Sequence, residues 1–345
     1  MGNMVSLDSL SGPRWTVGLF VLLASLWGTS FVAIEVGLHH FPPLYFAGAR
    51  YLLAGLAIMT VAVLTDPSWL PRERADWVSI GIVAVFIIAA NHAFLYLGEL
   101  YVPGAVAAVV VSLSPVLTIL MASVMLGRGL PRVHEALGFL LGIAGVLVIA
   151  NPDPSALDVS HLTGIGLVFL SAASFAVGGV LSRPFRSSLP IVPLQAWSMV
   201  LGSLLLLVVG WARGERVAGI EYSTTGAISL GYLVVFSGVI AFLVYFTLLD
   251  RIGPSQLNLV GYLEPVVASI MGYLVLGHVI AVGTAAGFLL IALGFTLIQR
   301  DVLIRVLDHS MPSVAGFLHD VGGAVELLFR SNSVGYRLHG PYGKR

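Results

Sequence analysis

Four ionisable side chains stand inside stretches of the sequence that are otherwise apolar: Glu35, Arg50, His92 and Glu264. At the centre of a bilayer an Asp, Lys or Arg side chain costs about 2.5–3.5 kcal/mol on insertion scales. Such residues therefore usually face a protein interior or a water-filled cavity, and they take part in binding or proton transfer. These four residues are the first candidates for a functional site.

Arg50 and Glu35 lie on the same side of two neighbouring apolar stretches. Arg50 is six residues into the stretch 44–64, which places it about 9 Å below the end of a helix that rises 1.5 Å per residue. Glu35 is in the last turn of the stretch before it. Two interpretations stay open: an ion pair that fastens the two stretches, or an arginine that binds a substrate carboxylate or phosphate bidentately.

A third stretch carries Asn91, His92 and Tyr96. His92 and Tyr96 are four residues apart, so they share one face of a helix, and they could line the same chamber as Arg50. Histidine titrates near neutral pH, which suits proton coupling. A hydrogen-bonded packing histidine is an equally good interpretation.

Glu264 lies near the middle of a later apolar stretch and has no charged neighbour in sequence. An apolar environment favours the neutral form of a carboxyl. Glu264 is therefore predicted to exchange a proton or to meet a cationic substrate group. The alternative is a neutral acid that is hydrogen-bonded between helices.

Pro115 and Pro265 are candidate hinges. Each proline removes the backbone hydrogen bond to the carbonyl four residues earlier, at Val111 and at Gly261. Within a bilayer those carbonyls need a partner from protein or water. The pair predicts two kinks beside a central cavity, with simple tolerated kinks as the alternative.

Aromatic residues within the stretches include Trp27, Trp197 and Tyr245. They are predicted either to wall a site for a planar or amphipathic substrate or to serve as ordinary packing. Tryptophans at the ends of stretches are predicted to anchor the protein at the membrane surface; they are Trp15, Trp69, Trp77 and Trp211.

The composition explains what positions these residues. The chain is 58% hydrophobic and only 10% charged, whereas a soluble domain is about a quarter charged. A membrane helix needs about 20 apolar residues. The sequence divides into ten such stretches, near 16–37, 44–64, 77–98, 103–126, 134–150, 162–182, 192–212, 226–249, 255–276 and 280–299. An all-α integral membrane protein with ten transmembrane helices is predicted.

The basic residues predict the orientation. If the N-terminus is cytoplasmic, 14 of the 17 Lys and Arg residues fall on the cytoplasmic side, Arg213 and Arg216 fall outside, and Arg50 is within a stretch. This bias predicts a multi-pass protein of the cytoplasmic membrane with both termini inside. Residues 1–15 form a cytoplasmic segment, and the tail 300–345 is either a helix on the inner membrane surface or disordered.

The two halves of the chain are related. An offset of 150 aligns residues 94–127 with 244–277, and an offset of 149 aligns the segment Gly138–Leu141 with Gly287–Leu290. Ser114 then corresponds to Glu264, so the halves differ chemically at this point. Because each half, 16–150 and 162–299, holds five helices, the second half is predicted to be inverted, as in many transporters.

The sequence also resembles a known family, the EamA-type members of the drug/metabolite transporter superfamily. The resemblance rests on Trp27-Gly28-Thr29-Ser30-Phe31, on Arg50 after Pro42-Pro43, on Ser114-Pro115 before Leu126-Gly127, and on Leu263-Glu264-Pro265 before Leu276-Gly277. It covers roughly residues 16–299. Family members commonly place Glu after each Leu-Gly, but Arg128 and His278 stand there in this sequence, so no role of those acids is carried over.

The resemblance implies export or exchange of a small polar or amphipathic metabolite, with amino acids and related compounds the leading candidates. Protons are a candidate coupling ion. No cofactor, metal site or nucleic-acid partner is expected: the chain has no cysteine for a thiolate site and no His-Glu-x-x-His motif, and no basic patch lies outside the connections. A membrane enzyme or a channel is the alternative. Glycine pairs at 138/142 and 283/287 predict close helix contacts within one chain or in a homodimer.

Overall fold

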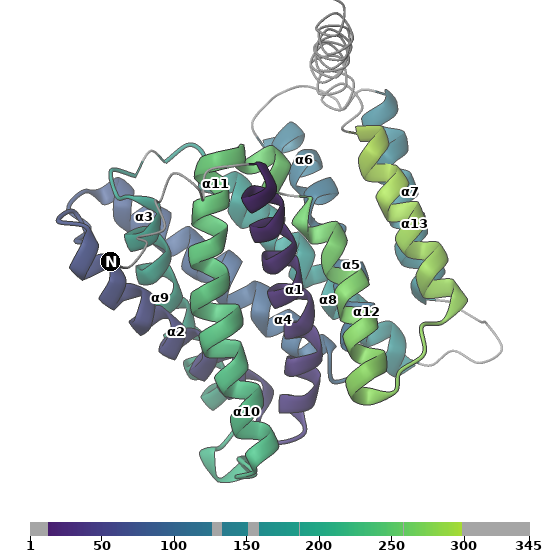
Figure 1. The fold of residues 1–345 in the computed structure, drawn as a ribbon, viewed down its shortest axis with the longest axis horizontal. Coiled ribbons are helices and arrows are strands. Elements are labelled where there is room, and N and C mark those ends of the chain that lie inside the picture. The colour runs from purple at the N-terminus through teal and green to yellow at the C-terminus, as the bar shows by residue number, and fades with distance from the viewer. Residues whose placement is uncertain (1–12, 126–132, 151–158, 186, 258, 299–345) are drawn as a thin grey trace, which may run out of the picture. The chain divides into compact units, whose positions relative to one another are not determined.

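The computed structural model describes residues 13–125, 133–150, 159–185, 187–257 and 259–298 (Figure 1). Residues 1–12, Arg128, Arg132 and the whole tail 300–345 with its predicted surface helix lie outside the described residues. Within the described ranges all regular secondary structure is helical. The prediction of an all-α protein is confirmed for this part of the chain.

The helices follow the apolar stretches closely. In the first half they are α1 (Pro13–Leu38), α2 (Pro43–Thr65), α3 (Arg74–Ile82), the π-helix η2 (Val83–Ala90), α4 (Asn91–Gly98), α5 (Gly104–Val111), α6 (Ser114–Met125) and α7 (Val133–Ala150). In the second half they are α8 (Val159–Leu181), α9 (Ile191–Ala212), the 3-10 turn η3 (Val217–Gly219), α10 (Thr224–Tyr232), the π-helix η4 (Leu233–Ile240), α11 (Ala241–Leu257), α12 (Val260–Leu276) and α13 (Val282–Ile298).

Seven continuous helical segments are long and apolar enough to cross a bilayer. Three shorter apolar helices, Ala136–Ile149, Val260–Leu276 and Val282–Ile298, match the other three predicted stretches. Crossing is thus supported by length and composition for seven of the ten stretches, and for these three it stays a prediction.

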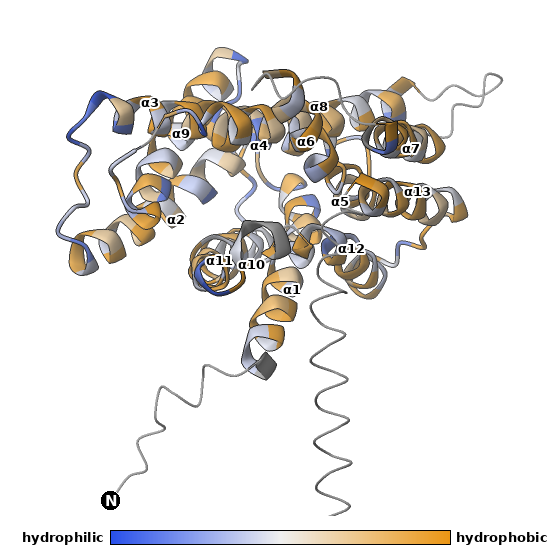
Figure 2. Ribbon diagram, turned by 90° about the horizontal axis from the view of Figure 1, so that it is seen from above, coloured by the Kyte–Doolittle hydropathy of each residue, from blue (hydrophilic) through white to orange (hydrophobic). Residues whose placement is uncertain are grey.

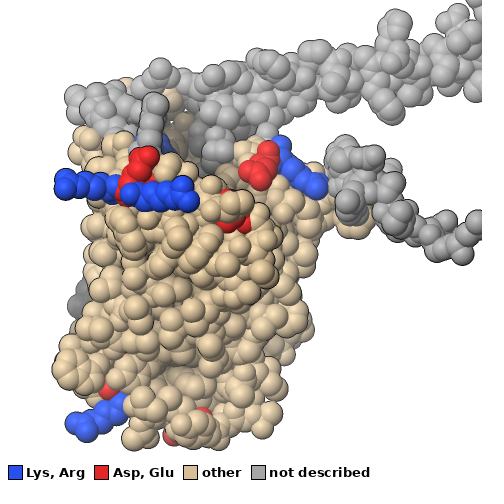
Figure 3. All heavy atoms as spheres, turned by 90° about the vertical axis from the view of Figure 1, so that its left-hand side faces the viewer, with Lys and Arg blue, Asp and Glu red and all other residues tan. Residues whose placement is uncertain are grey.

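The outside of the bundle has the surface that lipid requires. Many large apolar side chains are exposed there, among them Leu64 (78%), Trp211 (73%) and Leu274 (68%), and apolar residues cover most helices (Figure 2). On the face drawn in Figure 3, charged side chains gather at the two ends and leave an uncharged band between them. An apolar surface of this extent indicates contact with a membrane.

The two ends of the bundle are held differently. At one end, which we call the His40 end, Glu215 accepts hydrogen bonds from the backbone N–H groups of Leu44 and Tyr45, where α2 begins. At the other, which we call the Trp69 end, buried Asp76 accepts hydrogen bonds from Ser187 and Ser188, just before α9. The first contact ties the residues after α9 to the start of α2, and the second ties the connection before α9 to the start of α3; α2 and α9 themselves pack together (Figure 1).

The helices α7 and α13 lie side by side at one edge of the bundle (Figure 1). A Cβ atom added to Gly138 would strike the carbonyl oxygen of Gly294, and one on Gly145 would lie 2.6 Å from that of Gly287. Only glycine permits this approach. The close contact is therefore present within a single chain, but it is made by Gly138, Gly145, Gly287 and Gly294; of the other two predicted glycines, a Cβ on Gly142 would meet Leu113, and one on Gly283 would lie 3.5 Å from Val148 O.

Two π-helical segments interrupt the third and eighth stretches, where the sequence predicts continuous α-helix. η2 and η4 stand 150 positions apart, so that Val83 corresponds to Leu233 and Ala90 to Ile240. Side chains of other helices bond carbonyls of these segments: Ser174 Oγ donates to Phe86 O at 2.8 Å, and Trp27 Nε1 donates to Ser237 O at 3.3 Å. Such segments occur frequently at functional sites.

Candidate functional site

Arg50 is the centre of a buried polar cluster. Its side chain is only 4% exposed; Nη1 donates to Tyr96 OH at 3.1 Å and Nη2 donates to Ser237 Oγ at 2.8 Å. The guanidinium carbon lies 4.9 Å from the ring centre of Tyr51, which is close enough for cation–π attraction. A buried cation is thus held by neutral groups, and one of its three nitrogens, Nε, has no partner.

His92 extends this cluster. Its Nδ1 lies 2.9 Å from the carbonyl oxygen of Ile88, and its Nε2 bonds the hydroxyl of Tyr51. A carbonyl oxygen only accepts, so Nδ1 carries a hydrogen, and Nε2 of the neutral ring can accept from Tyr51. We call Arg50, Tyr51, His92, Tyr96 and Ser237 the Arg50 network. The sequence analysis predicted three of its members, Arg50, His92 and Tyr96, and the structure places these three in one network.

Asn91 does not join this network. Its amide nitrogen donates to the carbonyl and to the hydroxyl of Ser171, both at 3.0 Å. Ser171 belongs to α8, so this buried pair of bonds ties two helices together. The arrangement fits a structural role in packing α4 against α8.

The structure does not bring Glu35 and Arg50 together as an ion pair. Glu35 Oε2 instead accepts from the backbone N–H of Gly104 at 2.8 Å, and Oε1 lies 3.5 Å from His278 Nδ1. The end of α1 lies beside the beginning of α5, where unpaired N–H groups attract a carboxylate. Glu35 thereby has its own partners.

Glu99 was missed by the sequence analysis. Its side chain is 5% exposed, and neither carboxyl oxygen has a hydrogen-bond partner. Burial raises the pKa of this carboxyl well above its usual range; the charge of Glu35 adds to the effect and that of Arg50 opposes it. One signal was available: the connection between two apolar stretches is only residues 99–102, which leaves the side chain little room to turn towards water.

The two candidate hinges differ. Pro115 follows the break between α5 and α6, and Ser114 Oγ donates to Val111 O at 2.6 Å. Ser114 thus satisfies the carbonyl that the proline leaves free. Pro265 instead lies inside the uninterrupted helix α12. The paired kinks expected from the sequence are present as a helix break only at the first proline.

Glu264 lies in α12, half-buried, and its carboxyl makes no hydrogen bond to any described residue. A Cβ atom added to Gly28 would lie 2.8 Å from Glu264 O. The neighbouring Trp27 donates to the backbone of Ser237, whose hydroxyl binds Arg50. Glu264 and the Arg50 network therefore meet α1 at adjacent residues, at the same level of the bundle.

The aromatic candidates separate into two groups. Trp27 and Tyr245 pack together with ring centres 5.5 Å apart, beside the Arg50 network. Trp197 lies elsewhere, at the Trp69 end: its Nε1 donates to Trp69 O at 3.0 Å, and it stacks on Trp69 and meets the edge of Trp77. Trp27 and Tyr245 can wall a site near Arg50, whereas Trp197 belongs to a separate cluster.

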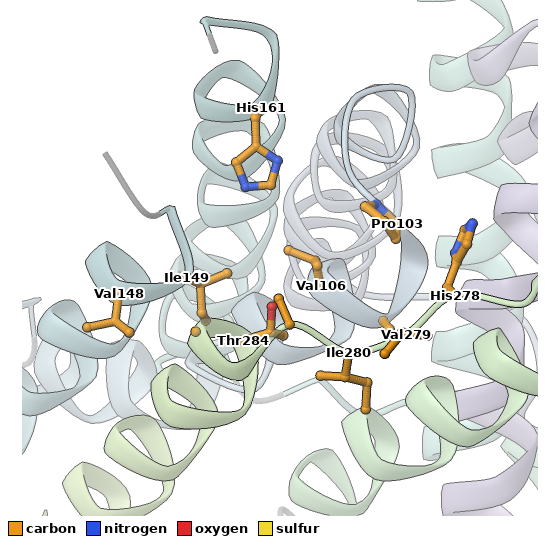
Figure 4. Close-up of a pocket in the computed structure, with 12 residues that line it drawn as sticks. Pro103, Val106, Val148, Ile149, His161, His278, Val279, Ile280 and Thr284 are labelled. Carbon is orange, nitrogen blue, oxygen red and sulfur yellow. The ribbon is translucent and has the colours of Figure 1, made fainter. Parts of the chain in front are cut away.

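A cavity of about 390 Å³ opens at the His40 end (Figure 4). Its lining comes from the beginnings of α5, α8 and α13, the end of α7 and the connection after α12. His278 contributes to the lining and touches Glu35, as described above. The cavity therefore lies beside Glu35.

Long apolar helices, an apolar exterior and a buried charged cluster define a multi-pass helical membrane protein. The model of the EamA-like transporter family matches residues 14–151 and again residues 162–300. The chain belongs to the EamA-like transporter family, as the sequence motifs predicted.

Individual relatives agree with this assignment. An uncharacterized transporter of Archaeoglobus fulgidus is 26% identical over 83% of this chain and 99% of its own length. The uncharacterized inner membrane transporter YedA of Escherichia coli K12 is 26% identical over 74% of this chain and 81% of its own. A solved crystal structure with 20% identity has a TM-score of 0.59 and covers 86% of this chain and 99% of its own, which shows a similar fold.

Proposed function

We propose that this protein exports a small polar or amphipathic metabolite, such as an amino acid or a related compound, by alternating access. The observation that carries the proposal is the buried guanidinium of Arg50, which has neutral partners and an unused Nε donor. Arginine binds carboxylates and phosphates bidentately. Arg50 would therefore hold an anionic group of the substrate, and Trp27 and Tyr245 would wall the same space.

The proposed mechanism requires two inverted five-helix halves, 16–150 and 162–299, that rock about this site. Three observations support it. The family model matches the chain twice, and η2 and η4 recur 150 positions apart. In addition, Gly138 and Gly145 correspond to Gly287 and Gly294 at the offset of 149, and each contacts the counterpart of the other. A two-fold axis between the halves would produce such reciprocal contacts.

The orientation follows from the excess of Lys and Arg on one side. Both termini would be cytoplasmic, so the Trp69 end would face the cytoplasm and the His40 end the outside. Pro115 and Pro265 would allow the fourth and ninth stretches to bend. Glu264, without a hydrogen-bond partner among the described residues, would exchange the coupling proton. No part of this mechanism requires enzymatic turnover.

Flux measurements in proteoliposomes test this proposal. Purified protein is reconstituted and assayed with a panel of labelled amino acids and related metabolites, with and without a pH gradient. We expect gradient-driven flux of at least one compound, and we expect Glu264→Gln to abolish it while the variant elutes as folded protein. Glu221→Gln makes the same change at a side chain that is 78% exposed and serves as the control.

Two results would contradict parts of the proposal. Unchanged flux in Glu264→Gln would remove that residue from the coupling mechanism. Chemical turnover of a panel compound in detergent, where no gradient exists, would identify a membrane enzyme instead.

A further inference from the structure

Glu99 is the one carboxyl in the described part of the molecule whose two oxygens are both buried without a hydrogen-bond partner. A buried acceptor without a partner is destabilising, and more so when it is charged. Burying a neutral carboxylic acid in such an environment costs much less free energy than burying a carboxylate. The position favours a group that binds a proton.

The surroundings determine what that proton controls. Glu35 contributes from α1, Arg50 from α2 and Tyr96 from the same helix as Glu99. The helix α5 has no titratable residue, and the residues of α8 that pack on Gly98 are Gly164 and Val168. Among the described residues, Arg50 is the one cation whose charge acts on Glu99, and Glu35 is the one anion.

Glu35 and Glu99 are not equivalent. Glu35 is bonded to the N–H of Gly104 and lies beside His278, so its charge has local partners. Glu99 has none. Of the two, Glu99 is the carboxyl that can change its charge without breaking a hydrogen bond.

We propose that Glu99 is a proton-binding site that governs access of an anionic substrate to Arg50. With its proton, Glu99 is neutral and leaves the guanidinium free to attract a substrate carboxylate. Without the proton, Glu99 becomes the internal counter-ion of Arg50 and repels that carboxylate. This rests on the proposed role of Arg50 and narrows the substrate class to compounds that carry a carboxylate.

Linkage gives the measurable consequence. Because the carboxylate binds the protonated form, substrate affinity decreases as pH rises above the pKa of Glu99, by up to about tenfold per pH unit when one proton is linked. Each carboxylate that binds is then accompanied by one proton on Glu99. The same coupling raises the proton affinity of Glu99 when substrate is bound, because linkage is reciprocal.

The first experiment needs no substrate. Infrared difference spectra of the purified protein, recorded between neutral and alkaline pH, detect the C=O stretch of buried protonated carboxyls. We expect a band that disappears at alkaline pH in the wild type and in Glu221→Gln, and that is missing in Glu99→Gln. A wild-type spectrum without a Glu99 band at neutral pH would overturn the proposal.

The second experiment measures binding of benzoate by calorimetry in detergent at constant ionic strength, with benzamide as the uncharged counterpart. We expect wild-type affinity for benzoate to fall with rising pH, and Glu99→Gln to bind with the same affinity throughout. Glu35→Gln removes the like charge beside Glu99, so the decrease should begin at lower pH. This second variant keeps the test decisive if Glu99→Gln does not fold.

The outcomes separate this inference from the proposed function. Tight benzoate binding with a flat pH profile in the wild type would overturn the role of Glu99 and leave Arg50 as the anion site. No benzoate binding at any pH would overturn both the linkage and the Arg50 assignment. Metabolite flux in proteoliposomes would still report on transport itself.

Discussion

Asp76 and Glu99 are both buried acids, at opposite ends of the segment formed by α3, η2 and α4, but their surroundings differ. Asp76 is 0% exposed and accepts hydrogen bonds from five donors: the backbone N–H groups of Arg72, Glu73 and Ser188 and the hydroxyls of Ser187 and Ser188. Glu99 is equally hidden and accepts none.

The difference separates a structural charge from a functional one. The five donors replace the water that Asp76 loses, so its charge holds the connection before α3 to the one before α9. We call Asp76, Ser187, Ser188 and the tryptophans at 69, 77 and 197 the Asp76 joint. In contrast, the two carboxyl oxygens of Glu99 and the Nε of Arg50 are buried without any hydrogen-bond partner. Unsatisfied buried groups of this kind persist where function requires them.

Replacing Asp76 should have the largest effect. Asp76→Ala leaves several buried donors unpaired, and we expect the protein to lose about 3 kcal/mol of stability, at about 1 kcal/mol or more per donor. Thermal unfolding in detergent measures this loss. Asp66→Ala is the control, because among the described residues the Asp66 carboxyl accepts from the N–H of Ser68 alone. If both variants unfold at the same temperature, Asp76 is not the structural anchor.

Arg50→Lys tests the other side of the comparison. Lysine keeps the charge but cannot donate to Tyr96 and Ser237 in the planar geometry of the guanidinium. We expect flux and carboxylate affinity to decrease by about tenfold or more, which corresponds to roughly 1.4 kcal/mol of binding energy, with little loss of stability. The exposed Arg213 offers the matched control, Arg213→Lys. Wild-type flux in Arg50→Lys would place substrate binding elsewhere.

Hydropathy predicted most of the fold because each helix must satisfy its own backbone in lipid. The bounds of α2, predicted as 44–64 and observed as Pro43–Thr65, illustrate this. The π-helical form of η2 and η4 could not be predicted, because an apolar run specifies burial and not which carbonyl each N–H reaches. Hydrophobicity does not distinguish those hydrogen-bond patterns.

The candidate site was only partly predictable for a similar reason. Arg50 and Tyr96 were identified because charged and polar groups are conspicuous in apolar stretches. The partner of Glu35 depends on how α1 packs against α5, and the isolation of Glu99 depends on how α4 packs against α8; local sequence encodes neither. Nothing in the sequence distinguishes Ser237 from other serines; it accepts a hydrogen bond from Arg50 because tertiary packing brings η4 against α2.

Glu99→Gln should change stability in a pH-dependent manner. Burial raises the pKa of Glu99 above that of an unfolded Glu, which is about 4.3. The folded wild type therefore binds the proton more tightly, and its stability falls as pH rises from that value through the folded pKa. Glutamine does not titrate, so the variant should be equally stable at pH 4 and more stable than the wild type at pH 8, by a margin that grows with pH up to the folded pKa of Glu99. Melting curves of the variant and the wild type between pH 4 and pH 8 measure the sign of this stability difference. A variant that is less stable than the wild type at alkaline pH would mean that Glu99 is a carboxylate with hydrogen-bond partners, like Asp76.

Trp197→Phe should have the smallest effect. It allows the Asp76 joint and the Arg50 network to be compared through the same substitution, Trp to Phe, at Trp197 and at Trp27. Phenylalanine keeps an aromatic ring against Trp69 and Trp77 but loses the hydrogen bond from Nε1 to Trp69 O. We therefore expect a loss of about 1 kcal/mol of stability and unchanged flux.

Trp27→Phe makes the identical change beside the Arg50 network, where Nε1 bonds the carbonyl of Ser237. There we expect a similar loss of stability together with reduced flux, because Ser237 positions the guanidinium of Arg50. Equal flux losses in the two variants would mean that the Asp76 joint moves together with the substrate site during transport.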